Sequence, residues 1–229
     1  MASSEALPAL RDSSPVGLGF IPLGIAFGVF LTHAGLAWWC APLFATVIYA
    51  GSFEFLLVGL VTAVVPLAAI ALTAFLVNVR HVFYALSFPL HRVHGRGAKT
   101  YSTFALTDEA YALSTSGPAQ AWPTRRILWL QAFLQLYWVS GATAGALLGA
   151  LVPHRVTGLS FAMTALFAVL AIEAIRAGRG DLPTPVLAAL SALAARLIFP
   201  GELLLTAFTL FTAGLLARYL ITSRRPCHA

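Results

Sequence analysis

The sequence predicts an all-α polytopic membrane protein with about seven transmembrane helices. Hydrophobic residues make up 59% of the chain and charged residues only 10%, where a soluble domain carries about 25%. The mean hydropathy is +0.86. A soluble protein of 229 residues has too little interior volume to bury that much apolar surface. The lipid bilayer is therefore the expected surroundings of most of the chain.

The same composition excludes several classes of protein. A chain this apolar is not disordered, and its formal net charge of +6 is the basic surplus that membrane proteins keep in their cytoplasmic loops, so no nucleic-acid partner is expected. Cys40 and Cys227 form neither a disulfide framework nor a metal-ligand spacing. No zinc-protease, hydrolase or nucleotide-binding motif occurs. We expect no catalytic residue, no metal, no bound cofactor and no removable signal peptide.

The predicted spans are apolar runs long enough to cross a hydrocarbon core of about 30 Å as helices. The first run follows Pro15, where the sequence changes from aqueous to apolar, and Pro66 separates the second run from the third. In chain order the seven runs are Val16–Thr32, Cys40–Val64, Leu67–Leu86, Ile127–Val152, Leu159–Ile175, Pro185–Phe199 and Leu203–Ile221.

We expect these runs to form a single transmembrane domain over residues 16–222. An N-terminal tail at 1–15 and a C-terminal tail at 223–229 flank it, and a polar stretch at 89–126 connects the third run to the fourth. Within that stretch, residues 101–122 hold two acids and many Ser and Thr side chains, which argues against a lipid-facing span. A re-entrant segment that lines a cavity is the alternative.

Lysine and arginine residues predict the orientation, because they are retained on the cytoplasmic side of a membrane. With seven spans, nine of them fall on one side and two on the other. The N-terminus is therefore expected outside and the C-terminus in the cytoplasm. An eighth span would instead place the N-terminus in the cytoplasm. The cytoplasmic set is Arg92, Arg96, Lys99, Arg125, Arg126, Arg176, Arg179, Arg224 and Arg225, against Arg11 and Arg155 outside.

A weak internal duplication accompanies the runs. Gly24 and Gly28 recur at a nearly constant offset as Gly141 and Gly145, Pro66 recurs as Pro183, and Arg80 as Arg196. Two repeats, 16–88 and 127–200, would each have three spans, and an odd number of spans makes the second repeat inverted, with one extra helix left over. Inverted repeats with sites near the midplane are typical of secondary transporters. Coincidence is the alternative.

Ionisable residues deep within spans are expensive and mark candidate sites. In the third run, Asn78, Arg80, His81 and Tyr84 fall within an arc of about 160° on one helix face. This face must point at protein or water rather than lipid. It is either a structural network that pins helices together or a substrate and proton site, since Arg binds carboxylates and His titrates near neutral pH.

The second run is interrupted at Gly51 and Ser52, followed by Phe53 and Glu54. Gly and Ser permit a helix break, which would offer N–H groups to an anion and unwound carbonyls to a cation. Glu54 would then bind an ammonium group or carry a proton. The alternative is that the small residues only allow close packing, with Glu54 paired to Arg80 or Arg196.

Two further motifs mainly indicate how helices start and pack. Thr107 followed by Asp108 and Glu109 resembles a capped helix N-terminus, and the alternative is that the two acids gate a cytoplasmic mouth or belong to a proton path. Glycines four positions apart, Gly24 and Gly28 in the first run and three after Trp138 in the fourth, predict close helix packing.

Taken together, these motifs resemble the AzlC-type branched-chain amino acid exporters of bacteria. The matching stretches are Ala50–Phe55, Asn78–Ser87, Thr107–Glu109, Trp138 with Gly141 and Gly145, and Gly158–Phe167. Many relatives carry Gln in place of Glu54, and often Asp in place of Ser160. The resemblance implies export of leucine, isoleucine and valine across the inner membrane, together with a small AzlD-type membrane subunit.

The expected protein is thus a secondary transporter subunit driven by the proton gradient. The substrate carboxylate would meet Arg80 or the N–H groups at Gly51 and Ser52, and its ammonium group would meet Glu54 or unwound carbonyls. Its side chain would rest among Phe53, Tyr84 and Trp138. Asn78 is a further substrate-binding candidate. The proton would be carried by Glu54, His81, Asp108 or Glu109, and Arg196 is the repeat counterpart of Arg80.

Two alternatives belong to other classes of protein. The chain would be a passive channel or assembly subunit if the coupling chemistry lay in the partner. It would be an intramembrane enzyme if Glu54 and His81 acted as acid and base, but no nucleophile or metal set accompanies them in the sequence.

Overall fold

Every regular element among the described residues is a helix, which confirms the predicted all-α fold. The structure, a computed structural model, describes residues 5–115, 119, 121–151, 168, 171–172, 175, 183–199 and 203–223. Most of the fifth predicted run, Leu159–Ile175, lies outside them. The chain divides into two units, Met1–Ala165 and Leu166–Ala229.

One helix of the described chain, α1 (Ala6–His33), is long and apolar enough to cross a membrane. Four shorter apolar helices accompany it: Gly51–Thr62, Leu67–Asn78, Pro183–Ile198 and Leu205–Ile221. The number of seven spans therefore stays a prediction.

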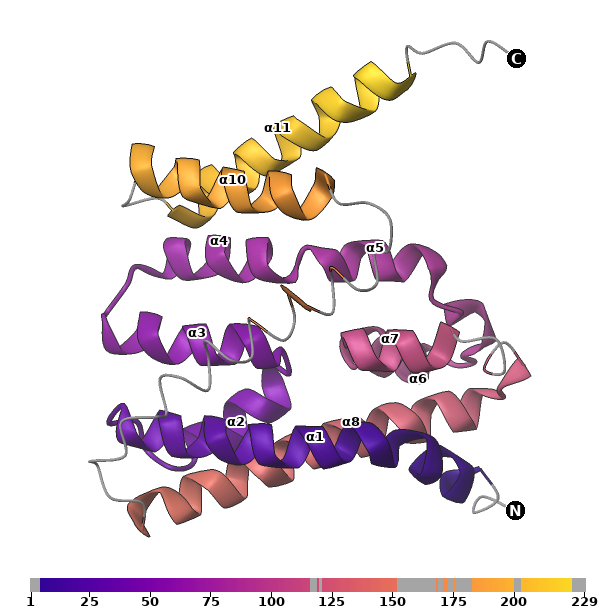
Figure 1. Ribbon diagram of the computed structural model, residues 1–229. Coiled ribbons are helices and arrows are strands. Elements are labelled where there is room, and N and C mark those ends of the chain that lie inside the picture. The colour runs from indigo at the N-terminus through magenta and orange to yellow at the C-terminus, as the bar shows by residue number, and fades with distance from the viewer. Residues whose placement is uncertain are drawn as a thin grey trace. The chain divides into compact units, whose positions relative to one another are not determined.

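The first unit is built on the pairing of α1 with α8 (Thr124–Leu148), which lie side by side in Figure 1. Helix α1 begins at Ala6, ten residues before the predicted run, and continues through Pro15 and Pro22. A Cβ atom on Gly24 would lie 2.9 Å from the backbone nitrogen of Ala142, and Cβ atoms on Gly28 or Gly145 would meet backbone of the opposite helix more closely still. The predicted close packing of these glycines is confirmed.

The two helices run parallel. At one end Arg126, in the first turn of α8, donates to Asp12 near the start of α1 over 2.7 and 3.0 Å. At the other end His33, the last residue of α1, bonds the carbonyl of Gly149 over 3.1 Å, where η3 (Gly149–Leu151) follows α8. The start of α1 and the start of α8 therefore lie at one end of the unit, which we call the Thr124 end; the opposite end is the Gly149 end.

The second predicted run is a hairpin that returns to the end from which it starts. Helix α2 (Cys40–Val47) begins at the Gly149 end, just after α1, and its Thr46 carbonyl reaches Gln135 in the middle of α8. The chain then breaks at residues 48–50, with Tyr49 in the left-handed region at φ 48°. Helix α3 (Gly51–Thr62) leads back toward the Gly149 end (Figure 1).

The third run passes from the Gly149 end to the Thr124 end as two consecutive helices. Residues 63–66 turn the chain from α3 into α4 (Leu67–Asn78), and α5 (Arg80–Ser87) continues it. Beyond α5, Phe88 and Val93 pack against Ile127 in the first turn of α8. The short helix η1 (Leu90–Arg92) ends there, where the Thr124 hydroxyl donates to the carbonyl of Arg92.

The polar stretch forms a second hairpin, which starts and ends at the Thr124 end. Helix α6 (Arg96–Phe104) reaches the middle of α8, where Gln131 donates to the carbonyls of Ser102 and Ala105 over 2.8 and 3.3 Å. Helix α7 (Asp108–Thr115) leads back, and Arg92 donates to the carbonyl of Ala119 over 3.3 Å. That residues 101–122 form a re-entrant segment stays a prediction.

These paths correct part of the predicted topology. A membrane-crossing second run would place the starts of α1 and α8 on opposite sides, and inverted repeats 16–88 and 127–200 would oppose the directions of these two helices. The structure instead shows α1 and α8 parallel, because the second run turns back at Tyr49. Arg11 and Arg125 therefore lie at the same end of the first unit, and the predicted separation of Arg11 from the basic loop is wrong.

Cysteine labelling checks this arrangement. In a chain whose natural cysteines are replaced by serine, single cysteines at the exposed positions 11 and 125 are expected to react with an impermeant maleimide from the same side of the membrane. A cysteine in place of the exposed Ala37, between α1 and α2 at the Gly149 end, serves as the opposite control and is expected to react from the other side. Labelling of positions 11 and 125 from opposite sides would contradict the parallel packing.

The second unit contains α10 (Pro183–Ile198) and α11 (Leu203–Ser223), which pack as an antiparallel pair. Arg218 donates to the Thr184 hydroxyl over 2.7 Å, and Gly214 lies against the Leu187 side chain. Both helices match predicted runs, the sixth beginning two residues earlier and the seventh ending two residues later. Arg196, the predicted counterpart of Arg80, lies in the last turn of α10.

Candidate functional site

The two hairpins turn beside the middle of α8, where one face of that helix carries three hydrogen-bonding side chains. We call residues 46–54 the first tip and residues 101–109 the second tip. Gln131, Gln135 and Trp138 are spaced four and three residues apart, so they share a face of α8. Gln131 holds the second tip, Trp138 holds the first, and Gln135 touches both, accepting from the Tyr101 hydroxyl over 3.0 Å and donating to Thr46.

The first tip contains a carboxylate that is fully buried. Glu54, in the first turn of α3, has no exposed surface. One of its oxygens accepts the backbone N–H of Ala50 over 2.9 Å, and the indole N–H of Trp138 lies 3.1 Å from each of its oxygens. The Ala50 bond closes the start of α3 as a capping side chain does, so this N–H is satisfied within the protein.

Aromatic side chains enclose this carboxylate. The ring of Trp138 stacks on Phe27 of α1 at a centroid distance of 6.0 Å, and Phe27 meets Phe55 edge-on at 5.2 Å. Gly51 leaves room for the indole, since a Cβ there would lie 3.2 Å from the ring. Glu54 is thus held by two N–H donors in an apolar shell, and it forms no ion pair within the described part of the chain.

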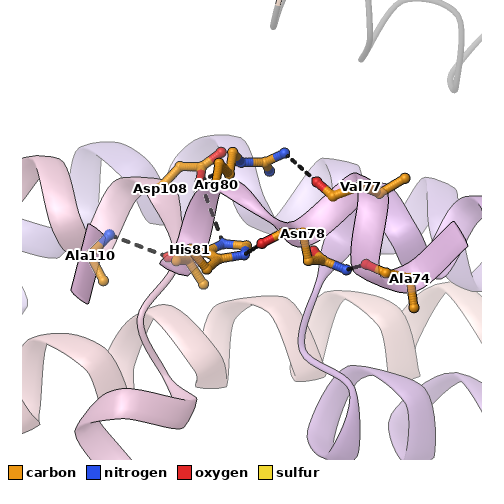
Figure 2. Close-up of polar contacts among 8 residues, drawn as sticks. Ala74, Val77, Asn78, Arg80, His81, Asp108 and Ala110 are labelled. Carbon is orange, nitrogen blue, oxygen red and sulfur yellow. Dashed lines mark hydrogen bonds and ion pairs between the residues drawn. The ribbon is translucent and has the colours of Figure 1, made fainter. Parts of the chain in front are cut away.

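The second tip carries an ion pair with the junction of α4 and α5. Arg80 donates through Nε to Asp108 over 2.9 Å and through Nη1 to the Val77 carbonyl over 3.1 Å (Figure 2). Nε2 of His81 lies 3.6 Å from the same Asp108 oxygen. The Arg80 side chain is 38% exposed in the structure and that of Asp108 is 30% exposed, so both can be reached by a ligand.

Hydrogen bonds within the chain segments around Asp108 and His81 hold these two side chains in place. The hydroxyl of Thr107 accepts the backbone N–H of Ala110 over 3.2 Å, which confirms the predicted cap and places Asp108 and Glu109 in the first turn of α7. Nδ1 of His81 bonds the Asn78 carbonyl over 3.1 Å, which leaves Nε2 directed at Asp108 (Figure 2). The Asn78 amide donates to Ala74, and its oxygen has no partner among the described residues.

Tyr84 extends this cluster along α5. Its ring stacks on Tyr111 of α7 at 4.5 Å and meets His81 edge-on at 5.5 Å. The Tyr111 hydroxyl bonds Ser87 over 2.7 Å. Helices α5 and α7 are therefore joined by a layer of polar and aromatic side chains from Arg80 to Ser87.

The predicted site residues form two groups rather than one. Glu54, Gly51 and Trp138 meet at the first tip, and Asn78, Arg80, His81, Tyr84 and Asp108 meet at the second. A break interrupts the second run, but it lies at residues 48–50 rather than at the predicted Gly51 and Ser52, which begin α3; Ser52 and Phe53 are buried in that helix. The alternative pairing of Glu54 with Arg80 is wrong, because Arg80 is taken by Asp108 and Glu54 by Trp138 and Ala50.

Sequence reasoning missed Tyr49, Tyr101, Ser102, Gln131 and Gln135. The two glutamines had a signal, since they lie four residues apart within an apolar run and must share a helix face. Tyr49, Tyr101 and Ser102 had none, because only the turning of both hairpins brings them to α8.

Replacing Trp138 by Phe tests the first tip. The variant is expected to destabilise the protein by about 1–3 kcal/mol, because the buried Glu54 carboxylate keeps only the Ala50 N–H. The midpoint of thermal unfolding measures this effect. Trp129→Phe is the matched control, since Trp129 is 40% exposed and lies on the same helix; equal losses in both variants would contradict the role of the indole N–H.

No group of three or more His, Cys, Asp and Glu side chains in the described part of the chain could hold a metal ion. The absence of a metal or cofactor was expected from the sequence and stays an expectation.

Comparison with known proteins gives consistent results. The family model described as AzlC protein matches residues 15–152. The branched-chain amino acid transport protein AzlC of Bacillus subtilis is 36% identical over 163 residues, which are 69% of this chain and 63% of that protein. An uncharacterized membrane protein of Haemophilus influenzae is 32% identical, covering 70% and 67% of the two chains. The inner membrane protein YgaZ of Escherichia coli is 29% identical, covering 72% and 71%. No solved structure matches.

Proposed function

The chain belongs to the AzlC family, and from this we propose that it is a subunit of an inner-membrane secondary transporter that exports branched-chain amino acids. The aligned region covers 63% of the length of the Bacillus subtilis relative, so the activity of that whole protein supports the proposal for this chain. Transport of leucine, isoleucine and valine is driven by the proton gradient and needs a small AzlD-type membrane subunit.

The observation that carries the proposal is the meeting of two interrupted hairpins beside α8. Interrupted helices with charged groups at their breaks are how many secondary transporters bind small solutes inside an apolar protein. Here the first tip brings Glu54 to Trp138 in the middle of α8, and the second tip brings Asp108 to Arg80 at the junction of α4 and α5. Burying such charged groups inside an apolar protein costs free energy, so their presence there indicates a functional site.

Arg80 binds the substrate carboxylate. A guanidinium presents five N–H donors in a planar fork, and the structure uses Nε for Asp108 and Nη1 for Val77. A carboxylate that approaches the exposed part of Arg80 exchanges places with Asp108, so binding weakens the link between α5 and the second tip. Aromatic rings beside the tips, those of Tyr84 and Phe53 among them, receive the branched side chain.

Asp108 and His81 carry the coupled proton. When Arg80 turns to the substrate, Asp108 loses the cationic hydrogen-bond partner that occupies its carboxylate, and the carboxylate can then accept the coupled proton. His81, 3.6 Å from the same oxygen, passes that proton on. Proton uptake and substrate binding are thereby linked through one side chain.

The partner and the bilayer cover apolar surface of the first unit. Helix α4 has no buried residue, and Leu67 and Phe75 on it are 83% and 60% exposed. Lipid, a second membrane subunit or another part of this chain can provide the apolar surroundings that such a helix requires.

Efflux from cells loaded with leucine-containing dipeptides tests the proposal. Cells carry this chain alone, the small partner alone, or both, and faster saturable efflux is expected with both, collapsing when an uncoupler is added. Efflux that is fast but neither saturable nor sensitive to the uncoupler would indicate a passive channel. Unchanged leucine efflux, with both proteins confirmed in the membrane, would overturn the substrate assignment.

A further inference from the structure

Charge is distributed unevenly between the two ends of the first unit. Six Lys and Arg residues lie at the Thr124 end against two acids, and one of these acids, Asp12, is paired with Arg126 over 2.7 Å. Residues 33–42, 59–67 and 146–151, which form the Gly149 end, contain no Asp, Glu, Lys or Arg. The basic residues are Arg11, Arg92, Arg96, Lys99, Arg125 and Arg126, and the acids are Glu5 and Asp12.

Four of these basic side chains are free to bind a ligand, and we call them the basic surface: Arg11, Arg96, Lys99 and Arg125. All four are exposed, and none of them forms an ion pair within the described part of the chain. They come from the beginnings of α1, α6 and α8, which lie at this end of the unit. A fixed surplus of positive charge attracts anions.

The exposed side chains that come next toward the middle of the unit are apolar. Trp129 lies four residues after Arg125, so it shares a face of α8 with it, and it is 40% exposed. Leu18 lies seven residues after Arg11 on one face of α1 and is 77% exposed. A basic group, an aromatic ring and then aliphatic side chains match the order of headgroups, interface and hydrocarbon in a bilayer. This order favours a lipid over a soluble anionic partner.

The Gly149 end has the features of the opposite membrane interface. Trp38 and Trp39, between α1 and α2, are 52% and 54% exposed, and Trp side chains gather at the interfaces of a membrane. Arg11 and His33 are 22 positions apart in α1, which is about 33 Å at a helical rise of 1.5 Å per residue. This length is close to the hydrocarbon thickness of about 30 Å, so the two ends lie one membrane thickness apart.

We propose that the Thr124 end faces the cytoplasm and that the basic surface binds the phosphate groups of anionic phospholipids in the cytoplasmic leaflet. Lys and Arg are retained on the cytoplasmic side, and anionic headgroups there attract basic residues next to the membrane. The start of α1 and both ends of the α6–α7 hairpin then lie in the cytoplasm, with the loop between α1 and α2 outside. This orientation reverses the one that the sequence predicts for the N-terminal tail, and it does not depend on the transported solute.

Cysteine labelling from each side of the membrane tests the orientation. In the chain whose natural cysteines are replaced by serine, a single cysteine at position 125 is expected to react with an impermeant maleimide in inside-out vesicles only. A cysteine at position 37 is expected to react in intact spheroplasts only. Labelling of position 125 in intact spheroplasts would overturn the proposal, since the basic surface would then face the outer leaflet.

The unfolding midpoint of the full chain in lipid nanodiscs tests the lipid contact. Replacing part of the phosphatidylcholine by phosphatidylglycerol is expected to raise the midpoint by about 2 °C or more, and high salt is expected to remove this rise. The double variant Arg96→Gln/Lys99→Gln removes two of the four charges and is expected to lose about half of the rise. Arg96→Lys/Lys99→Arg is the matched control, since it keeps both charges and is expected to retain the rise.

Each other result would overturn the lipid contact. No rise in the wild-type chain would show that the basic surface has no affinity for these headgroups, and an equal rise in the Gln variant would place their effect elsewhere on the chain. Equal losses in the Gln variant and the charge-keeping variant would indicate a packing role for the two side chains. A rise caused by inorganic phosphate in phosphatidylcholine nanodiscs would assign the surface to a free anion.

Discussion

Replacing Arg80 by Gln is expected to lower leucine efflux at least about tenfold while the complex still reaches the membrane. Truncating one partner of a hydrogen-bonded charge pair costs about 2–5 kcal/mol in binding, and the partial exposure of Arg80 brings the effect toward the lower bound. Gln keeps a hydrogen-bond donor near the Val77 carbonyl but removes the charge that holds Asp108 or a substrate carboxylate. Efflux from dipeptide-loaded cells measures the loss.

Two controls separate binding from structure. Arg11→Gln removes an exposed arginine from α1 and is expected to leave efflux unchanged. Arg80→Lys keeps the charge without the planar fork and is expected to recover only part of the activity. Loss of membrane expression in Arg80→Gln, or full efflux in that variant, would show that the Arg80–Asp108 pair only pins α5 to α7.

Replacing Gly145 by Ala is expected to destabilise the protein by about 1–3 kcal/mol or more. A Cβ at this position would overlap the carbonyl of Ile25 and lie 2.7 Å from the Ile25 Cα, both backbone atoms of α1. Backbone cannot swing aside as a side chain can, so α1 and α8 must separate along their contact. Because α8 also carries Gln131 and Trp138, leucine efflux is expected to fall with stability.

Gly19→Ala is the matched control for this substitution. It lies on α1 as well, but a Cβ there would meet nothing within 4 Å, so the unfolding midpoint is expected to be unchanged or slightly raised, since Ala favours helix over Gly. Equal unfolding midpoints for Gly145→Ala and the wild-type protein would contradict the packing of α1 on α8.

Short sequence motifs predicted the features of the fold that depend on residues close together in the chain. The glycines at positions 24, 28, 141 and 145 predicted the close pair of α1 and α8, and Thr107 predicted the start of α7. Gly51 and Ser52 in an apolar run predicted a break close to Glu54, and the break lies just before them at residues 48–50. Each of these features depends on residues within a few positions of each other.

The path of the chain could not be predicted in the same way. An apolar run of the length of Cys40–Val64 fits one crossing of a membrane or two half-crossings equally well, since hydropathy does not record direction. The backbone of Tyr49, at φ 48°, decides between them. This turn reverses the second run, and α1 and α8 are parallel, whereas the predicted inverted repeats 16–88 and 127–200 require these two helices to be antiparallel.

The partners of the charged side chains could not be predicted from the sequence either. Glu54 and Arg80 are the obvious partners for two buried charges of opposite sign, yet the second tip supplies Asp108 to Arg80, and the indole of Trp138 satisfies Glu54. Such choices depend on which distant segments meet at α8. The polar residues on this face of α8, Gln131 and Gln135, were recognisable only as a polar pair in an apolar helix.

Hydrogen–deuterium exchange of the complex, with and without leucine, tests most directly whether the substrate lies where the hairpins meet. Amides at interrupted helices exchange more readily than those inside long helices. Leucine is expected to slow exchange at residues 46–54 and 101–109, with little change at the ends of α1 and α8, and lysine at the same concentration is expected to have no effect. Saturating leucine that slows exchange elsewhere in the complex, with both tips unchanged, would contradict the site.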